Sequence, residues 1–159
     1  MSLITLKKII SGGQSGVDRA ALDVALKYNI SCGGWCPKGR RAEDGPIEER
    51  YPLQEAEDEK YETRTRLNVL SSDATLILFQ TVPDKGTILT KELTKVYAKP
   101  LLEVDLKESW KYTLQKTMGW LENHQVKTLN IAGPRESNSP GVYSTAFRFL
   151  ERLVTFDIN

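Results

Sequence analysis

Three short loops combine glycine with polar or charged side chains, and each lies between an apolar run and a stretch with helical periodicity. They are 12–18 (GGQSGVD), 84–87 (DKGT) and 133–137 (GPRES). Small residues at a helix start leave backbone N–H groups free, and the helix dipole there favours an anion such as phosphate. Arg135 adds a guanidinium suited to bidentate capture of phosphate or carboxylate. Ligands of open α/β sheets bind beyond the carboxyl ends of the strands, so we expect the three loops to form one anion pocket.

Each loop also has a purely structural interpretation. Ser15-x-x-Asp18 fits a capping box, in which Ser15 caps a helix and Asp18 returns a bond to the cap backbone. Gly12 and Gly13 could serve a tight turn alone, and a Gly-Thr helix start at Gly86 is common. Capping and ligand contact can coexist at Asp18, so the sequence leaves both open.

Several cofactor classes lack their motifs. No lysine follows the first glycines as in a P-loop, and the spacing misses the dinucleotide G-x-G-x-x-G. No acidic residue between Asp23 and Glu43 could hold an adenine ribose, so we expect neither NAD nor FAD. Cys32 and Cys36 have a C-x3-C spacing unlike most zinc sites, and the only histidine, His124, is distant in sequence. We therefore expect no metal site, and His124 is read as a residue near a helix end.

Apolar patterning predicts strands that alternate with helices. Strand-like runs cover 8–11, 74–79, 101–104 and 128–132. Helical patterns cover 17–28, 105–123, a stretch after Gly86 with Leu89, Leu93, Val96 and Tyr97 inward, and a last helix with Ser139 as N-cap and Pro140 at N1. This order indicates an α/β fold of three layers, with a mostly parallel sheet flanked by helices. Its length of 159 residues predicts a single domain over 1–159.

One segment, 31–59, lacks periodicity and is rich in glycine, proline and charge. We expect an ordered but irregular flap, since long structureless stretches in compact domains are usually functional or disordered. Its cations Lys38, Arg40 and Arg41 could close over an anionic ligand or neutralise Glu43 and Asp44. Its apolar anchors would be Trp35, Tyr51 and Leu53.

Charge and hydropathy exclude other classes of partner. The chain has 22 Lys+Arg and 21 Asp+Glu, a net charge of +1, so no basic footprint for nucleic acid or a membrane surface is present. No apolar run is long enough to cross a bilayer, and residues 1–10 show no signal-peptide core. We expect a cytoplasmic protein that binds neither nucleic acid nor membranes.

Three blocks carry a resemblance to a known family: 12–18, 34–45 (GWCPKGRRAEDG) and 132–137 (AGPRES) with Pro140-Gly141. They resemble the molybdenum carrier family, a branch of the Rossmann-like superfamily that includes lysine-decarboxylase-like (LOG) and YpsA-like proteins. The resemblance implies a Rossmann-like fold and a phosphate-bearing, nucleotide-like ligand, which for carrier members is the molybdenum cofactor (molybdopterin). It also implies a homo-oligomer, dimer or tetramer, with molybdoenzymes as possible recipients. The helix between Trp110 and Trp120 is a candidate interface.

Combined with the loops, the resemblance predicts a set of ligand-binding residues. The first glycine loop would hold phosphate, Gly86 and Thr87 would offer a second helix terminus, and Arg135 would act as a charge clamp. Arg64 and Asn68, one helical turn apart, would line the base or pterin side, although a solvated helix is the alternative. The set is Gly12, Gly13, Gln14, Ser15, Gly16, Asp18, Lys38, Arg40, Arg64, Asn68, Gly86, Thr87, Gly133, Pro134, Arg135 and Glu136.

The enzymatic relatives implied by the same resemblance cleave nucleoside monophosphates to base and ribose phosphate. They carry an arginine upstream of a strand, which Arg64 matches in spacing, and then P-G-G-x-G-T-x-x-E. Here Thr90 stands where the catalytic glutamate would be. Such hydrolysis needs a carboxylate, which Asp18, Glu43 or Glu136 could supply from another loop. The catalytic candidates are therefore Arg64, Asp18 and Glu136. We therefore expect a binding or carrier protein, with a nucleotide N-glycosidase (phosphoribohydrolase) and a nucleotide-sensing module as alternatives.

Overall fold

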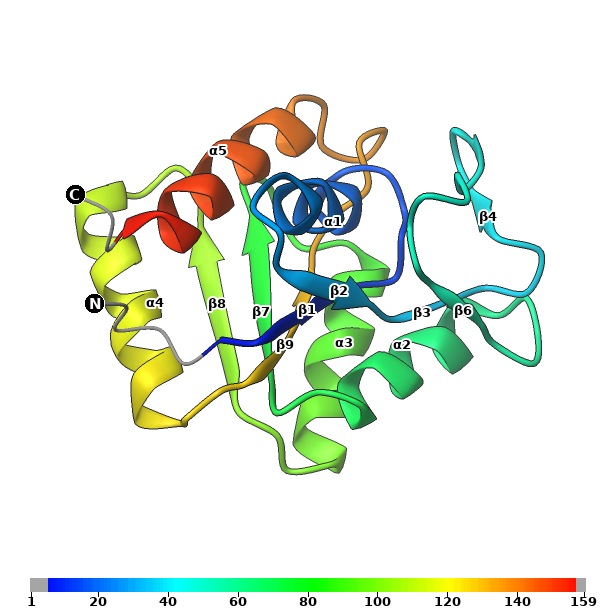
Figure 1. Ribbon diagram of the computed structural model, residues 1–159, viewed down its shortest axis with the longest axis horizontal. Coiled ribbons are helices and arrows are strands. Elements are labelled where there is room, and N and C mark those ends of the chain that lie inside the picture. The colour runs from blue at the N-terminus through cyan, green and yellow to red at the C-terminus, as the bar shows by residue number, and fades with distance from the viewer. Residues whose placement is uncertain (1–5, 157–159) are drawn as a thin grey trace.

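A computed structural model describes residues 6–156 and has a parallel sheet of five strands at its centre (Figure 1). The strand order is β2-β1-β9-β7-β8, and all four pairings are parallel. The strands are β1 (Lys8–Ile10), β2 (Ser31–Gly33), β7 (Ala74–Phe79), β8 (Leu101–Asp105) and β9 (Thr128–Ala132). The predicted α/β fold with a mostly parallel sheet is confirmed.

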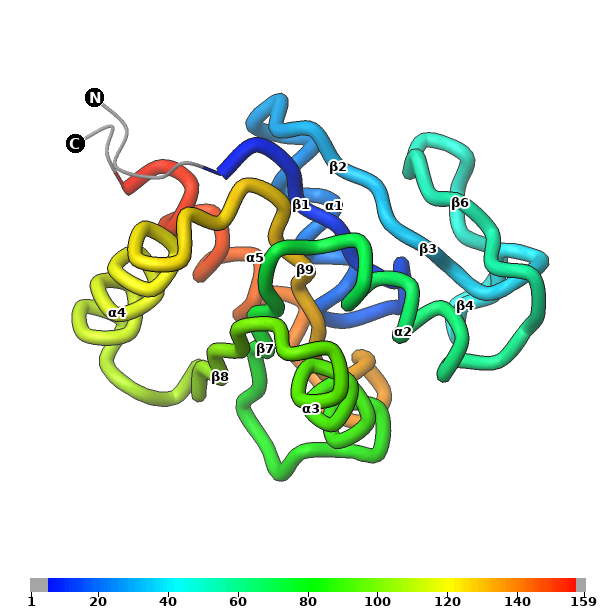
Figure 2. Tube along the Cα trace, turned by 90° about the horizontal axis from the view of Figure 1, so that it is seen from below, coloured from blue at the N-terminus to red at the C-terminus, as the bar shows by residue number. Residues whose placement is uncertain are grey.

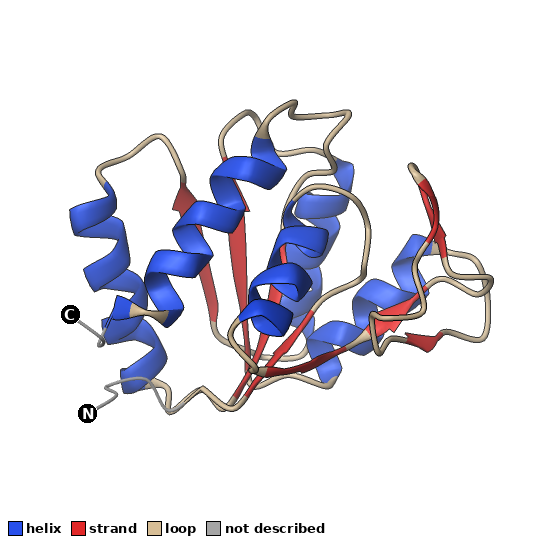
Figure 3. Ribbon diagram, turned by 45° about the horizontal axis from the view of Figure 1, so that its top comes forward, coloured by secondary structure: helices blue, strands red, loops and turns tan. Residues whose placement is uncertain are grey.

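Helices cover both faces of the sheet, as Figures 2 and 3 show. Helices α1, α4 and α5 lie on one face, and α2 and α3 lie on the other. Their bounds are α1 (Val17–Lys27), α2 (Tyr61–Leu70), α3 (Lys85–Val96), α4 (Trp110–Asn123) and α5 (Val142–Val154). Because β7 is covered on both faces, its residues 74–78 are all buried, as the continuous apolar run predicts.

The main core lies between the sheet and the layer of α1, α4 and α5. The predicted inward face of α1 is buried, from Val17 to Ala25, and so is that of α5, including Phe149 and Leu150. Trp110 packs edge-on against Phe149, with ring centroids 5.5 Å apart, and so joins α4 to α5. The 3.6-residue period therefore identified these helices and their inner faces correctly.

Two predicted helix starts are wrong. The last helix begins at Val142 with Gly141 as its N-cap, so Ser139 and Pro140 precede it as part of a turn. Gly141 has φ of +90°, a left-handed conformation that favours glycine. Helix α4 begins at Trp110 and not at Asp105, which ends β8.

In helix α3, one residue that was predicted to face inward does not. Val96 is 71% exposed, whereas Thr87, Thr90 and Thr94 are buried against the rest of the fold. The Thr90 hydroxyl donates to the Gly86 carbonyl, and that of Thr94 donates to a carbonyl one turn earlier. Threonine can be buried here because its hydroxyl is satisfied within the helix.

The segment 31–59 is more regular than predicted. Its first residues form β2 at the edge of the central sheet, beside β1. Beyond it lie two small sheets of two strands each. In one, β3 (Trp35–Cys36) pairs with β6 (Gln54–Glu55), and in the other β4 (Arg41–Ala42) pairs with β5 (Gly45–Pro46). The predicted anchors Tyr51 and Leu53 are buried in a small core with Leu22, Cys36 and Ile47, and Trp35 is half-buried. We use the name flap for 34–59.

Residues 1–5 and 157–159 lie outside the described part of the chain. Two predictions include some of these residues, namely the single domain over 1–159 and the absence of a signal peptide in 1–10. Within residues 6–156, no helix is long and apolar enough to cross a membrane. The same residues include no group of three or more His, Cys, Asp or Glu that could hold a metal ion. His124 is the C-cap residue of α4, near a helix end as predicted.

Candidate functional site

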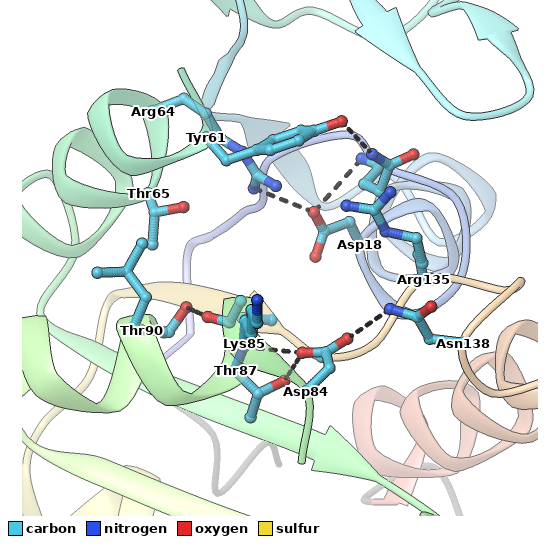
Figure 4. Close-up of a pocket in the computed structure, with 15 residues that line it drawn as sticks. Asp18, Tyr61, Arg64, Thr65, Asp84, Lys85, Thr87, Thr90, Arg135 and Asn138 are labelled. Atoms are coloured by element: carbon cyan, nitrogen blue, oxygen red, sulfur yellow. Dashed lines mark hydrogen bonds and ion pairs between the residues drawn. The ribbon is translucent and has the colours of Figure 1, made fainter.

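The carboxyl edge of the sheet carries a pocket of about 470 Å³ (Figure 4). This volume falls in the range of small-molecule sites, about 300 to 1,000 Å³. Four segments contribute to its lining: the loop after β1 and the first turn of α1 (Gln14 and Asp18), α2 (Tyr61, Arg64 and Thr65), the start of α3 (Asp84 to Thr87, Leu89 and Thr90), and the end of β9 with the loop after it (Ala132, Gly133, Arg135 and Asn138). The three loops predicted to converge therefore do converge, and α2 supplies a fourth wall.

A buried ion pair forms one wall of the pocket. Asp18 Oδ2 accepts hydrogen bonds from Arg64 Nη1 and from the Gln14 backbone N–H, both at 3.3 Å. The two charged side chains are only 6% and 15% exposed. Burial raises the pKa of Asp18 above its usual value, while Arg64 and the Gln14 N–H act in the opposite direction. The second carboxylate oxygen of Asp18 points toward the open centre of the pocket (Figure 4).

Arg64 has capacity for a further partner. Its Nε is buried and makes no hydrogen bond within residues 6–156. A buried N–H without an acceptor costs free energy, so such groups are rare outside functional positions. The position of this donor beside the pocket is consistent with a ligand acceptor at this wall.

The predicted capping box at α1 is not formed. The N-cap residue is Gly16, with φ of +80°, and no side chain caps the helix. A Cβ at Gly16 would lie 2.4 Å from the Pro134 carbonyl oxygen, so glycine allows the two loops to approach closely. Ser15 Oγ accepts the Glu136 backbone N–H at 3.2 Å and ties the loops together. The Asp18 carboxylate therefore pairs with Arg64 and lines the pocket.

Arg135 lies in the pocket with no acceptor for its guanidinium. Among the residues described, its side chain makes no hydrogen bond or ion pair, and its Cζ lies 5.3 Å from the centroid of the Tyr61 ring. Arg64 Cζ lies 5.4 Å from the same ring. The Tyr61 hydroxyl accepts from Gln14 Nε2 at 3.3 Å, which ties the ring to the glycine loop, with both guanidiniums near the same ring (Figure 4).

The N-terminus of α3 is occupied by a carboxylate of the chain. Asp84 is the N-cap, and its Oδ1 accepts from both the N–H and the hydroxyl of Thr87 at 2.9 Å. Its Oδ2 accepts from Asn138 Nδ2 at 3.1 Å. Burial opposes ionisation of Asp84, but the hydrogen bonds from Thr87 and Asn138 bring its pKa below the usual value. The Thr87 N–H, predicted to be free for phosphate, already has an anionic partner.

The structure brings some predicted site residues to the pocket and leaves others elsewhere. Those that line it are Gln14, Asp18, Arg64, Gly86, Thr87, Gly133 and Arg135. Those that do not are Gly12, Gly13, Ser15, Gly16, Lys38, Arg40, Asn68, Pro134 and Glu136. Gly12 and Asn68 line a cavity of about 10 Å³ next to the pocket, which also contacts Asp18 and Arg64.

Several of the residues outside the pocket have structural partners. The Asn68 amide bonds the Trp35 backbone in both directions, at 2.8 and 3.0 Å, and so fixes the start of the flap to α2. The Glu136 carboxylate accepts the N–H groups of Gly141 and Tyr143 at the start of α5. The Arg40 guanidinium donates to flap carbonyls, namely those of Ile47, Glu48, Tyr51 and Leu53. Arg40 therefore stabilises the flap itself.

The flap does not cover the pocket, since none of its described residues lines it. Its hairpin is bound to the neighbouring loops instead. The Glu43 carboxylate accepts the Ser137 hydroxyl at 2.6 Å, and the Glu43 N–H donates to Gln14 Oε1 at 2.8 Å. Asp44 pairs with Arg19 of α1 at 3.0 Å, so its partner is not one of the flap cations.

The predicted set lacks eight residues that line the pocket, namely Tyr61, Thr65, Asp84, Lys85, Leu89, Thr90, Ala132 and Asn138. Two of them lie three residues from a predicted arginine, Tyr61 before Arg64 and Asn138 after Arg135. On a helix this spacing places Tyr61 on the face of Arg64, which is a signal that the sequence contains. Thr90, which stands at the position of the relatives' glutamate, does line the pocket.

A parallel sheet between two helical layers, with a pocket at its carboxyl edge, defines a Rossmann-like α/β protein with a site of small-molecule size. The chain belongs to the circularly permutated YpsA SLOG family, whose model matches residues 9–154. It is also similar to a crystal structure from Syntrophus aciditrophicus SB, described as a "putative molybdenum carrier protein". The two share 43% identity and a TM-score of 0.92, over 95% of this chain and 96% of the other. No curated protein matches the chain. The predicted family is confirmed.

Proposed function

We propose that the protein is a carrier for a small ligand that joins a phosphate to a planar ring system, with the molybdenum cofactor as the ligand to test first. The observation that supports this most directly is Arg135, whose guanidinium faces the pocket and has no acceptor among residues 6–156. Arginine presents a rigid fork of donors that matches phosphate oxygens. The name given to the similar crystal structure points to the same kind of cargo.

The pocket offers different chemistry on its two sides. Arg135 and Lys85 would hold the phosphate, because neither side chain has an ion-pair partner in the described chain. On the other side, the open oxygen of Asp18 would accept from a ring amino group. Arg64 Nε would donate to a ring oxygen or nitrogen. Tyr61 supplies an aromatic face at the mouth, and aromatic faces suit planar heterocycles.

Binding without turnover is favoured over nucleotide hydrolysis. The position that would carry the catalytic glutamate is Thr90, whose hydroxyl is bonded to the Gly86 carbonyl. Glu136 lies outside the pocket and is bonded to the start of α5. Asp18 is already paired with Arg64. No observation singles out a sensing role, so we propose no second function.

Calorimetry tests the proposal. The protein is titrated anaerobically with molybdenum cofactor, and in parallel with AMP, CMP and GMP. We expect binding of at least one of these ligands, and a loss of about tenfold or more in affinity for Arg135→Ala, as for removal of a charge-assisted hydrogen bond. Arg148→Ala, an exposed arginine of α5 outside the pocket, is the matched control and should bind like the wild type. The proposal fails if none of the ligands binds, or if Arg135→Ala binds the ligand as tightly as the control Arg148→Ala.

Turnover and assembly need separate measurements. Incubation with the three nucleotides, followed by chromatography for free base, measures turnover. If free base is released, the protein is a phosphoribohydrolase and not a carrier. Self-association through α4 stays a prediction, as do the cytoplasmic location and molybdoenzyme recipients. Tyr112 is 57% exposed on α4, while Trp110 and Trp120 are half-buried. A strict monomer in light scattering would exclude the oligomer.

A further inference from the structure

The start of α3 is a position where a helix would ordinarily attract a ligand anion, yet the chain fills it with its own carboxylate. Asp84 accepts from the backbone and hydroxyl of Thr87 and from Asn138, so both of its oxygens are engaged. It lines the pocket at the same time. A fixed negative charge thus stands where a phosphate could otherwise meet the helix dipole.

The charged side chains that line the pocket determine how much negative charge a bound ligand can carry. Three cations line it, Arg64, Lys85 and Arg135, together with two carboxylates, Asp18 and Asp84. Arg64 is committed to Asp18. Lys85 and Arg135 therefore remain for the ligand, with Asp84 adjacent to Lys85 in the chain and near enough to Arg135 for the arginine to stabilise its charge.

We infer that Asp84 is a specificity-determining residue that restricts the pocket to ligands with a single phosphate. This inference rests on the proposed function. Arg135 and Lys85 can bind one phosphate together, and the charge of that phosphate neutralises both side chains. A second phosphate would meet the Asp84 carboxylate, which already occupies the Thr87 N–H at the helix terminus, and like charges held close together are strongly unfavourable. Discrimination arises from repulsion as well as from attraction.

The test compares monophosphate and diphosphate nucleotides in calorimetry, with AMP and ADP as one pair and GMP and GDP as another. For the wild type we expect the monophosphate to bind about tenfold tighter or more, the effect of one close charge pair. Asp84→Asn removes the charge but keeps the acceptor for the Thr87 N–H, since asparagine is as good an N-cap as aspartate. In this variant the preference should fall at least about fivefold, mainly through tighter binding of the diphosphate.

Asp105→Asn is the matched control. Asp105 also accepts a backbone N–H two residues later, from Lys107 at 2.9 Å, but it lies outside the pocket. The Asp105→Asn variant should prefer monophosphate over diphosphate by the same factor as the wild type. If monophosphates bind and Asp84→Asn leaves the preference unchanged, this inference is wrong and the proposed function stands. If no nucleotide and no molybdenum cofactor binds either protein, the proposed function fails and the inference fails with it.

Discussion

Replacing Arg64 by methionine should destabilise the protein in a way that depends on pH. The substitution keeps most of the side-chain volume and removes the cation that faces Asp18, whose side chain is 6% exposed. Breaking a buried pair by removing one partner costs about 3 to 5 kcal/mol, because a charge is left buried without compensation. Asp18 keeps the Gln14 N–H, and one of its oxygens opens to the pocket, so we expect the lower end, about 3 kcal/mol at neutral pH.

The sign of the pH dependence follows from the raised pKa of Asp18. The folded chain holds the proton more tightly than the unfolded chain, where the pKa is near 3.8. Asp18 therefore favours folding most at low pH, and its contribution falls as pH rises from the unfolded pKa through the folded one. Loss of Arg64 raises the folded pKa further. The stability difference between wild type and variant should thus widen with pH. The change is up to about 1.4 kcal/mol per pH unit over the range in which the Asp18 carboxyl is ionised in the folded wild type and still protonated in the folded variant.

Urea unfolding followed by tryptophan fluorescence, between about pH 5 and pH 8, measures this difference. Taking the difference between proteins cancels the other carboxyls, such as Glu43 and Asp44, whose pKa values are lowered and whose stabilisation is lost on acidification. Adding Asp18→Asn to Arg64→Met should restore most of the lost stability, since no charge remains to be buried. A loss below about 1 kcal/mol that is equal at both ends of the range would refute the reasoning.

Two further substitutions test the loops around the pocket. Gly133→Ala would place a Cβ 2.3 Å from the Leu78 carbonyl oxygen, and we expect a loss of about 2 kcal/mol or more in thermal unfolding; an unchanged midpoint would contradict the close packing. Arg40→Gln removes donors to several flap carbonyls and should make tryptic cleavage of the flap about tenfold faster. Arg41→Gln, which loses only an exposed pair with Glu59, is the control, and equal rates in the two variants would contradict a structural role for Arg40.

The elements with strong periodicity could be predicted, and those fixed by distant partners could not. Helix α1 and strand β7 follow directly from their apolar spacing. Strand β2 has only Ser31 to Gly33 and becomes a strand because it pairs with β1, a contact that no local pattern reports. The buried threonines of α3 were missed for a related reason, since a polar residue satisfied by its own helix looks solvent-facing in a hydropathy pattern.

The site shows the same division. Gln14 and Arg135 could be placed because loops that follow parallel strands meet at one edge of a sheet. Arg64 lies on α2 and could be placed only through its spacing, which matches that of the arginine in the relatives. Which hydrogen-bond donors stay free at that edge depends on side-chain geometry, which the sequence does not reveal. Asp84 takes the Thr87 N–H. Arg40 turns into the flap, although its charge and position fitted a role over the pocket.

The position of β1 in the sheet has a consequence for how the chain folds. This strand lies between β2 and β9, and its pairing with β9 joins residues about as far apart in sequence as Lys8 and Thr128. Contacts of such long range form slowly, since the intervening chain must be ordered before they gain anything. During synthesis, one edge of β1 therefore stays unpaired until almost the whole domain has been made. That interval is when the apolar residues Ile9 and Ile10 are most exposed to pairing with other chains.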